Sequence, residues 1–351
     1  MNRQKRVTMY DLADALGISV GTVHRALHDT GRISEETKQR VLDMAEKMHF
    51  QINQNAQALR RGTLKIGVLL CCPIQPFCNE IQKGMENAFA DLTEFNVLSD
   101  IRVMPYCNAE QCAPTIRQTI ETFCDGSYHA VVLFLSGPTA TFQSAFNRLD
   151  TLGIPLVTVV NDIPLKNRVL HVAADGFGAG QMAADLLGLC CTGGRIAILT
   201  GSDTTYIHHE NARGFLHEPI KTPFSCIDMF EHLDDASLIC SQLQEILHTK
   251  QPYDGIYITS ASVIDAFDIL KELSPNQVPK IVTTDLFKEN RYLLDKRIIC
   301  ATIFQSPFQQ GKKAISKLYQ HLRGETIDNK ILIAPQIVFP SNAPSIPMED
   351  K

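Results

Sequence analysis

Residues 8–33 read TMYDLADALGISVGTVHRALHDTGRI, and this stretch decides how the chain is organised. Its apolar residues recur at spacings of three and four, which gives each of two short helices one apolar face. These residues are Leu12, Ala13, Leu16, Ile18, Val23, Ala26 and Leu27. Gly17 stands between the two runs, where glycine tolerates the left-handed backbone that ends a helix. The pattern predicts two short helices packed against each other across a tight turn.

The second helix of this pair has an outward face suited to DNA. Ser19 is placed to cap it by accepting a hydrogen bond from the backbone N–H of Gly21 or Thr22. Short or donor-bearing side chains reach base edges and phosphates in a major groove, and the outward residues here are Val20, Gly21, Thr22, His24, Arg25 and His28. We expect a DNA-reading helix, against the alternative of a helical pair buried in a larger core.

The same residues carry a family resemblance. TMYDLADALGISVGTVHRAL, followed by Arg32-Ile33-Ser34 and a third helical stretch over residues 35–48, resembles the DNA-binding head of the lactose-repressor family of bacterial regulators. The resemblance implies a helix-turn-helix head over residues 1–52, in which Thr8, Tyr10 and Ser19 join the DNA contacts. It also implies an operator that is double-stranded and pseudo-palindromic, bound by a homodimer.

The next segment, FQINQNAQALRRG over residues 50–62, resembles the hinge of that family. The resemblance implies a hinge helix and linker over residues 53–63, which folds when two subunits meet over the operator. Leu59 then corresponds to the leucine that wedges into the minor groove, with Asn53, Ala56 and Arg60 beside it. The alternative for Arg60 and Arg61 is a solvated pair of linker charges.

Charge is distributed unevenly along the chain. The first 62 residues carry ten Lys or Arg and seven Asp or Glu, whereas the whole chain of 351 residues carries 33 and 38, for a net charge of −5. An acidic body binds DNA poorly, so the DNA contact is assigned to the amino-terminal part. Because its basic excess is small, we expect two heads, and hence a homodimer, to supply enough phosphate contacts.

Composition indicates a cytoplasmic protein. No apolar run approaches the ~20 residues of a membrane helix, and the start MNRQKRV lacks the apolar core of a signal peptide. The eleven cysteines show no CxxC or Cys/His ligand spacing, which favours reduced, buried thiols over a metal or redox site. We expect no membrane partner, no metal and no cofactor, and a location in the cytoplasm with the nucleoid.

From Leu64 onward, β-rich runs alternate with stretches long enough for crossover helices. The runs are KIGVLL, IRVMPY, AVVLFL, PLVTVV, HVAA, RIAILT, GIYIT and KIVTTD. This alternation predicts an α/β fold, a doubly wound and mostly parallel sheet with helices on both faces. Ligands in such sheets bind beyond the carboxyl ends of the strands. Polar residues stand there, and among them we select Ser136, Asn161, Tyr206 and Ser260 as candidate ligand contacts.

Residues 64–340 resemble the two-lobed periplasmic sugar-binding-protein fold (type I) that forms the effector domain of the same family. The resemblance rests on KIGVLLCCPIQPFCNEIQKGMENAF, LGIPLVTVVND, HVAADGFGAGQMAADLL, GGRIAILTGSD with NARGF, IVTTDLF and CATIFQSPFQQGKKAI. It implies a first lobe over 64–162 and 305–325, a second lobe over 163–304 and 326–340, and a tail over 341–351. The lobe crossings are expected at hinge strands 161–163, 302–305 and 324–327.

Four effector contacts are implied by this resemblance. Phe77 corresponds to the aromatic that covers a sugar face, Arg213 to the arginine that donates to hydroxyls, and Asp285 and Gln305 to the carboxylate and amide of the other lobe. The alternatives are that Phe77 is a core residue, that Arg213 belongs to a surface ion pair, and that Asp285 and Gln305 cap helices.

The chain also departs from the family pattern. Val160 stands where an aspartate is frequent, and the TSAS segment has Ser and Ala where Asn-Asp is frequent. These departures weaken the expectation of a simple aldose and admit a polyol, a less hydroxylated ring or a sugar phosphate. GxSxG, HExxH and a P-loop lysine are absent from the sequence, so we expect no enzyme.

The sequence thus predicts a ligand-responsive transcription regulator, a repressor of carbohydrate uptake or catabolism genes. Its effector would be a small molecule, a sugar or polyol, bound between the lobes. The alternatives are a corepressor-type regulator that senses a purine or sugar phosphate, and an enzyme fused to a DNA-binding head.

Overall fold

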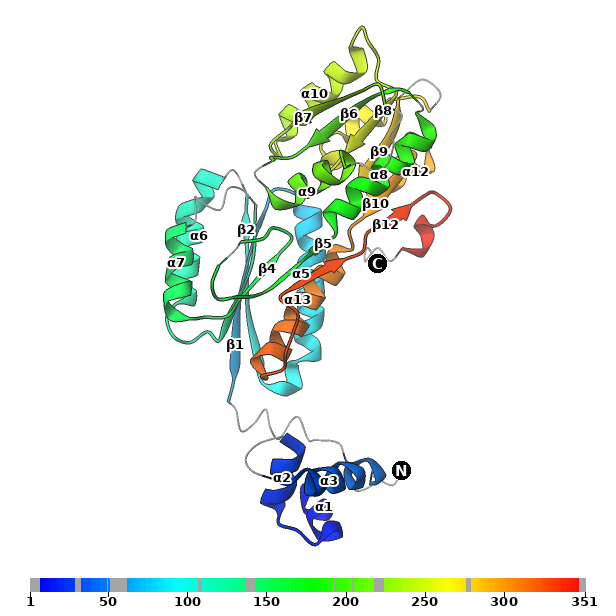
Figure 1. The fold of residues 1–351 in the computed structure, drawn as a ribbon. Coiled ribbons are helices and arrows are strands. Elements are labelled where there is room, and N and C mark those ends of the chain that lie inside the picture. Colours follow the sequence, from blue (N-terminus) through cyan, green and yellow to red (C-terminus); the bar gives the residue numbers. More distant parts are fainter. Residues whose placement is uncertain are drawn as a thin grey trace. The chain divides into compact units, whose positions relative to one another are not determined.

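Two compact units make up the chain, Met1–Gly62 and Thr63–Lys351 (Figure 1). The computed structural model describes residues 7–28, 33–48, 50, 62–106, 109–136, 143–163, 165–191, 193–203, 205–217, 224–275 and 279–346. Within these ranges, none of the helices has the length and apolar character needed to cross a membrane. The predicted hinge helix falls almost entirely outside them.

Three helices form the first unit. They are α1 (Met9–Leu16), α2 (Val20–His28) and α3 (Glu35–Lys47). Each has one apolar face, and the faces share a small core of Leu12, Ala13, Val23, Ala26, Val41 and Ala45. Gly17 ends α1 with a φ of 66°, the left-handed conformation that its position between the helices predicted. The helix-turn-helix prediction is confirmed for these residues.

The first sheet of the second unit has six parallel strands. They are β1 (Leu64–Cys72), β2 (Val97–Pro105), β3 (Ala130–Leu135), β4 (Leu156–Val159), β5 (Arg168–Ala174) and β11 (Lys330–Ile333). Their order in the sheet is β2-β1-β3-β4-β5-β11. The winding direction reverses between β1 and β3, which makes the carboxyl ends of these two strands a natural place for a ligand.

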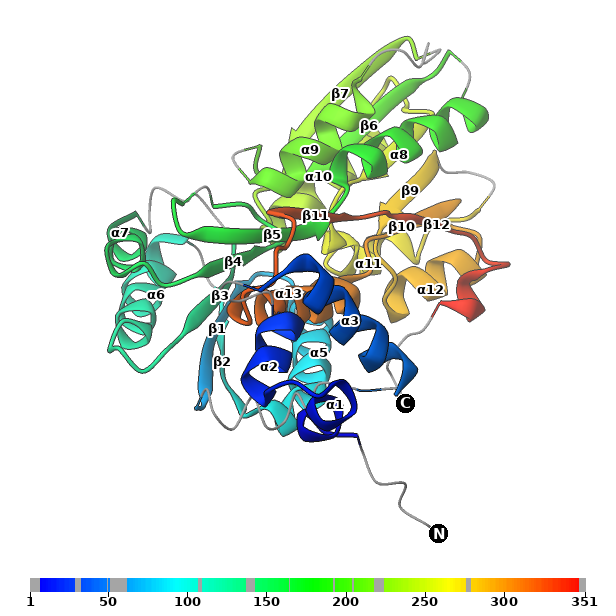
Figure 2. The same ribbon diagram turned by 60° about the horizontal axis from the view of Figure 1, so that its bottom comes forward.

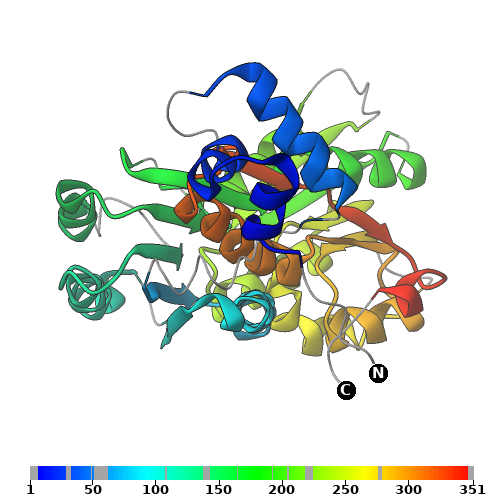
Figure 3. The same ribbon diagram turned by 90° about the horizontal axis from the view of Figure 1, so that it is seen from below.

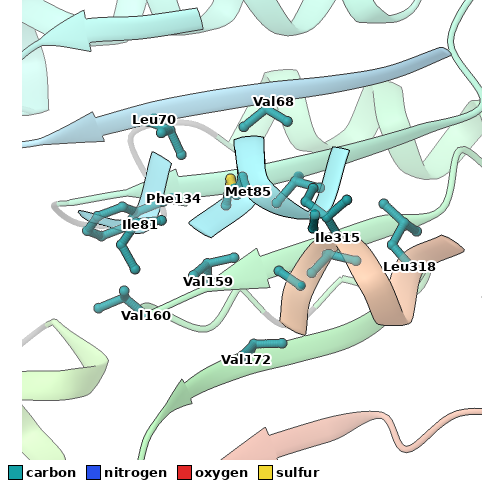
Figure 4. Packing of buried hydrophobic residues seen from close by; sticks show 14 of the residues in the cluster. Val68, Leu70, Ile81, Met85, Phe134, Val159, Val160, Val172, Ile315 and Leu318 are labelled. Carbon is teal, nitrogen blue, oxygen red and sulfur yellow. The ribbon is translucent and has the colours of Figure 1, made fainter. Parts of the chain in front are cut away.

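Helices cover both faces of this sheet. α5 (Gln75–Asp91) and α13 (Pro307–Leu322) lie on one face, and α6 (Ala109–Phe123) and α7 (Gln143–Leu152) on the other (Figure 3). Side chains of α5, α13 and the strands interlock on the first face, as Figure 4 shows for Val68, Leu70, Met85, Ile315 and Leu318. α5 and α13 approach so closely that a Cβ on Gly84 would overlap the carbonyl of Phe308.

The second sheet also has six strands. They are β6 (Arg195–Thr200), β7 (Cys226–Glu231), β8 (Gly255–Ile258), β9 (Lys280–Thr284), β10 (Ala301–Phe304) and β12 (Gln336–Val338), in the order β7-β6-β8-β9-β10-β12. All neighbours are parallel except β12, which runs antiparallel to β10. One face is covered by α8 (Gly176–Cys190) and α9 (Tyr206–Phe215), and the other by α10 (Ala236–His248), α11 (Phe267–Leu270) and α12 (Lys288–Asp295). Short 3-10 turns lie at Thr93–Phe95, Ala261–Ile264 and Ala343–Ser345.

Strand pairing corrects two of the expected lobe crossings. β5 pairs with β4 and β11 pairs with β5, so residues 168–174 and 330–333 belong to the first lobe rather than the second. The chain therefore crosses between β5 and α8 and again between β11 and β12, not at 161–163 and 324–327. Figure 2 shows β11 and β12 in succession on the two sheets. The remaining crossing falls between Phe304 and Pro307, where β10 leads into α13.

Candidate functional site

The exposed face of α2 is the first site that the structure builds. The Oγ of Ser19 accepts a hydrogen bond from the backbone N–H of Thr22 at 3.1 Å, which confirms Ser19 as the cap of α2. The Nη2 of Arg25 donates to the Oγ1 of Thr22 at 3.3 Å. Ser19, Gly21, His24 and Arg25 are exposed, while Val20 and Thr22 are half-buried. Short side chains and one cation thus line a single open helix face.

The other expected DNA contacts divide into two groups. Thr8 is exposed, and its hydroxyl and backbone form a capping box with Asp11 at the start of α1. Tyr10 is 70% exposed, so its side chain is accessible to a partner. The side chain of His28 lies outside the described residues, as do Asn53, Ala56, Leu59 and Arg60. The role of the hinge segment stays a prediction.

The second site is a cavity in the second unit, between its two lobes. Its lining comes from the ends of β1, β3 and β4 in the first lobe and from segments that follow β6, β7, β8, β9 and β10 in the second. This is the place that the winding of the two sheets indicates for a ligand. Six of the eight expected effector contacts line it: Phe77, Ser136, Asn161, Ser260, Asp285 and Gln305.

Asp285 and Gln305 form one polar group of this cavity. The backbone N–H of Gln305 donates to Oδ1 of Asp285 at 3.2 Å, and its Nε2 donates to Oδ2 at 3.3 Å. The side chain of Gln310 holds the Gln305 carbonyl in turn, at 3.0 Å. Burial raises the pKa of Asp285 to about 7, although the two bonds from Gln305 oppose the shift. A carboxyl group held in this way can accept or donate a hydrogen bond near neutral pH.

The first lobe supplies an aromatic wall and an amide. The ring of Phe77 meets that of Phe134 edge to face at 6.0 Å, and both rings line the cavity. Phe77 is also part of the hydrophobic core, so the alternative reading of this residue holds alongside the cavity position. The Nδ2 of Asn161 donates to the carbonyl of Leu135 at 3.1 Å, which leaves its buried Oδ1 without a protein partner.

Backbone strain concentrates around the same cavity. Val160, Asp234 and Asp285 have φ values of 65°, 57° and 65°, in the left-handed region that a β-branched valine rarely adopts. All three residues line the cavity. Such conformations each cost on the order of 1–3 kcal/mol and persist where the surrounding structure fixes them, typically at binding sites.

The structure does not bring Tyr206 or Arg213 into this cavity. Arg213 has a side chain 54% exposed, forms an ion pair with Glu210 at 2.7 Å and lies over the ring of Phe177. It is the surface ion-pair member of the alternative reading, and the expected cavity contact is corrected. Tyr206 instead contacts the first lobe, where its hydroxyl accepts a hydrogen bond from Nζ of Lys330 at 2.9 Å.

The periodicity of α9 explains these positions. Ile207, His208, Asn211, Ala212, Gly214 and Phe215 are its buried residues. Arg213 falls between them on the outward side, as the 3.6-residue repeat requires. Asn211 takes the inward place, where its Nδ2 donates to the carbonyl of Thr259 at 3.2 Å and its Oδ1 has no protein partner. Applied to HHENARGF, this repeat would have favoured Asn211 over Arg213.

The sequence interpretation also missed two ionisable residues of the cavity, His208 on α9 and Asp234 after β7. Nε2 of His208 lies 3.3 Å from Oδ2 of Asp234. The adjacent His209 pairs instead with Asp203 at 2.9 Å, because successive residues of a helix face different ways. Asp234 carried no signal in the sequence, because its turn follows a strand that the pattern did not predict.

The described cysteines are not joined in disulfide bonds. Cys71, Cys72, Cys78, Cys112 and Cys191 are buried, whereas Cys190 is exposed, contrary to the expectation of burial. Burial raises the pKa of Cys72, which lines the cavity, so its thiol stays protonated. In the part of the chain that the structure describes, no group of three or more His, Cys, Asp or Glu is arranged to hold a metal ion.

Known proteins resemble this chain along most of its length. HTH-type transcriptional regulator DegA of Bacillus subtilis is 26% identical over 60% of this chain and 60% of its own length, so the alignment spans less than two thirds of that relative. HTH-type transcriptional regulator RegA of Clostridium saccharobutylicum is 22% identical over 91% of this chain and 93% of its own. The ribose operon repressor of Lactococcus lactis is 22% identical over 93% and 95%.

Solved structures share the fold of the second unit. A glucose-galactose binding protein from Geobacillus stearothermophilus has a TM-score of 0.70 and 20% identity, and covers 80% of this chain and 99% of its own. A myo-inositol binding protein from Caulobacter has a TM-score of 0.68 and 18% identity, over 80% and 95%. At these identities the likeness shows the fold alone.

Two family profiles match the chain. The profile described as bacterial regulatory proteins, lacI family, matches residues 8–53, which hold the three helices of the head. The profile described as a periplasmic binding protein domain matches residues 66–326, which hold both lobes and the cavity between them. The chain therefore belongs to the lacI family of bacterial regulatory proteins, and residues 66–326 form its periplasmic binding protein domain.

Proposed function

We propose that this protein is a ligand-controlled repressor that binds operator DNA through α2 and senses a sugar or polyol in the cavity between its lobes. The observation that carries the proposal is the presence, in one chain, of a lacI-type head and a cavity built from the strand ends of two lobes. Neither part alone requires regulation by a ligand. Together they give two binding sites whose affinities can be coupled.

On the DNA side, a homodimer presents two α2 helices to the two halves of a pseudo-palindromic operator. Residues Val20 and Gly21 meet base edges, and Arg25 meets a phosphate or base. The hinge residues Asn53, Ala56 and Arg60 accompany Leu59 in the minor groove, where an inserted side chain kinks the duplex. The protein binds its operator in the cytoplasm, where the chromosome lies.

On the effector side, Phe77 covers an apolar face of the ligand while Asp285, Gln305, Ser136, Asn161 and Ser260 exchange hydrogen bonds with its hydroxyls. The cavity in this arrangement of the lobes measures about 50 Å³, room for a few waters and less than a sugar ring needs. Ligand binding therefore requires the lobes to separate and close again. A difference of ~1–3 kcal/mol between the two arrangements changes operator affinity about 5- to 150-fold.

The names of several relatives favour a carbohydrate over other effectors. Two relatives are named ribose operon repressors, and another is named the maltose regulon regulatory protein MalI of Escherichia coli. DegA and RegA are named as transcriptional regulators rather than enzymes, which disfavours the alternative of an enzyme with a DNA-binding head. By analogy, the genes controlled by this protein serve uptake or use of a carbohydrate.

A thermal-shift screen tests the effector half of the proposal. A compound that binds only the folded protein raises its stability by about RT ln(1 + [L]/Kd). Sugars, polyols, sugar phosphates, purines and nucleosides are compared at one pH and salt concentration. The proposal expects a shift with a sugar or polyol, and a shift confined to purines would contradict it.

Operator binding tests the other half. A random-sequence selection with the full-length protein should enrich a site with two inverted half-sites, and the compound found in the screen should change affinity for it at least 5-fold at fixed salt. Leu59→Ala should lower affinity for that site more than for random DNA and reduce bending. Equal losses on both DNAs would contradict the hinge assignment.

A further inference from the structure

His208 and Asp234 form an ionisable pair that faces the cavity from the second lobe. Nε2 of His208 lies 3.3 Å from Oδ2 of Asp234, and both residues belong to the lining. Their side chains are 9% and 10% exposed, so the pair is nearly shielded from bulk water. A buried charge in such a place needs partners on every side.

A second histidine, His232, holds the turn that carries Asp234. Nδ1 of His232 accepts the backbone N–H of Asp234 at 3.2 Å, while its Nε2 lies 3.3 Å from Oγ of Ser260, which also lines the cavity. Leu233 and Asp234 have φ values of 53° and 57°, so the turn that carries the carboxylate is held against its ordinary preference. The geometry of the pair is therefore specified by its surroundings rather than by chance packing.

Three buried side-chain atoms of the lining residues have no protein partner. They are Nδ1 of His208, Oδ1 of Asp234 and Oδ1 of Asn161 on the opposite lobe. The carboxylate of Asp234 places a proton on Nε2 of His208, while Nδ1 is an acceptor in the neutral ring and a donor in the charged ring. Because Asn161 donates through Nδ2 to Leu135, its Oδ1 is an acceptor. The two oxygens therefore require hydrogen-bond donors and Nδ1 requires a partner of either kind, and ligand hydroxyl groups can satisfy all three because they both donate and accept.

The charge of the lining favours an uncharged ligand. Among the lining residues that the structure describes there are two aspartates and no lysine or arginine. Although burial raises it, the imidazole of His208 holds the pKa of Asp234 below its ordinary value, so that carboxylate is ionised at neutral pH. A phosphate or carboxylate placed beside it would meet like charge at low dielectric, and the lining offers no lysine or arginine to offset the repulsion.

We propose that His208 and Asp234 are specificity-determining residues that bind hydroxyl groups of an uncharged polyhydroxylated effector and reject its phosphate esters. This inference rests on the proposed function and narrows its ligand class. It selects against the sugar-phosphate alternative that the sequence left open. Because Asn161 belongs to the other lobe, one ligand engaging all three atoms also draws the lobes together.

The full-length protein is titrated by calorimetry with D-ribose, D-galactose, D-allose and myo-inositol, and with a monophosphate ester of each. We expect at least one parent compound to bind, and its ester to bind at least 10-fold more weakly. An ester that binds more tightly than its parent overturns the inference and leaves a sugar-responsive regulator standing. Binding by none of the eight compounds overturns both the inference and the proposed effector class.

Variants then assign the discrimination to the pair. His208→Gln should weaken the best parent compound at least 10-fold, whereas His209→Gln, the matched change on the neighbouring exposed residue, should stay within 2-fold of wild type. Asp234→Asn should weaken binding of the parent compound, and it should also reduce the ratio of the parent's affinity to the ester's affinity. If Asp234 had a merely structural role, Asp234→Asn would lower both affinities equally and leave that ratio unchanged, which would overturn the proposal. Wild-type affinity of His208→Gln for the parent compound would also overturn it. The wild-type ratio remains decisive if a variant fails to fold.

Discussion

Tyr206 joins the two lobes through Lys330. The phenol stands at the start of α9 in the second lobe, and its oxygen accepts a hydrogen bond at 2.9 Å from Nζ of Lys330 on β11, in the first. The Tyr206 ring also meets the buried imidazole of His171 edge-on at 5.3 Å. These contacts cross from one lobe to the other, so they form when the lobes close and are lost when the lobes separate to admit a ligand.

Tyr206→Phe should therefore weaken effector binding. The change keeps the ring and removes one hydrogen bond, whose net value of about 0.5–1.5 kcal/mol corresponds to roughly a 2- to 10-fold loss of affinity. The matched control is Tyr253→Phe, which removes a hydrogen bond to Asp228 within the second lobe. Calorimetric titration with the compound found in the screen measures both. Equal affinities for Tyr206→Phe and wild type would show that the contact does not favour the bound arrangement.

Arg213→Ala should leave the response to effector intact. The guanidinium is exposed and paired with Glu210, away from the lining of the cavity. Exposed pairs of this kind contribute about 0–1 kcal/mol to stability, so the melting temperature should change little. Asn211→Ala is the contrasting variant, since Asn211 is buried on the inner side of the same helix and bonded to Thr259. Operator affinity with and without effector is the readout, and loss of response in Arg213→Ala would restore that residue to the site.

Much of the fold follows from patterns in the sequence. The eight apolar runs all coincide with strands, and seven of these strands are largely buried, which makes them read as continuous apolar stretches. β7 was not predicted, since this edge strand, CIDMFE, alternates partly exposed positions with acidic ones. The lobe crossings were misplaced for a different reason. Which sheet β5 joins depends on pairing between distant strands, and no local pattern encodes that choice.

Sequence patterns likewise predicted some residues of the candidate site and missed others. Asp285 and Gln305 follow strands at the carboxyl edge of a sheet, where the fold class already places ligands. Asp234 follows a strand that was not predicted, and Arg213 was selected without regard to the helical repeat that turns it outward. Residues whose role depends on tertiary turns, such as the left-handed Asp234, are those that sequence patterns identify least well.

Asp285 should make the protein less stable as pH rises. Burial raises the folded-state pKa of Asp285 to about 7, above its ordinary value near 4, so folding takes up a proton between these two pH values. The stability due to the protonated group is fully present below pH 4 and is lost as pH rises through 7. Asp285→Asn, which cannot ionise, should raise the free energy of unfolding by a few kcal/mol at pH 8 and by little at pH 4.

Urea unfolding at both pH values measures this difference. Asp268→Asn is the control, because the side chain of Asp268 is 83% exposed. Its free energy of unfolding should differ from that of wild type by nearly the same amount at pH 4 and pH 8. The same Asp285→Asn variant should respond more weakly to effector, since it replaces one carboxylate oxygen that accepts ligand hydroxyls with an NH2 donor. An equal gain in stability at pH 4 and pH 8 would contradict the buried ionisation.

The reading helix can be tested by changing its sequence preference rather than its affinity alone. A Cβ built on Gly21 would meet only Oγ of Ser19 at 3.8 Å, an ordinary contact, so a side chain fits there without disturbing α2. Val20→Ser combined with Gly21→Asn should therefore fold and select a different operator, since each base contact discriminates by about 1–3 kcal/mol. Selection from a random library measures the preferred site.

Arg25→Ala should act differently from that double change. Loss of one phosphate contact per subunit weakens binding about equally on all sequences and, for a dimer, reduces the slope of log affinity against log salt by about 2, without altering the selected site. Gln39→Ala, an exposed change on α3 that removes only a bond to Asp43, is the control and should preserve both affinity and preference. If the double variant selects the wild-type operator, α2 is not the helix that reads the bases.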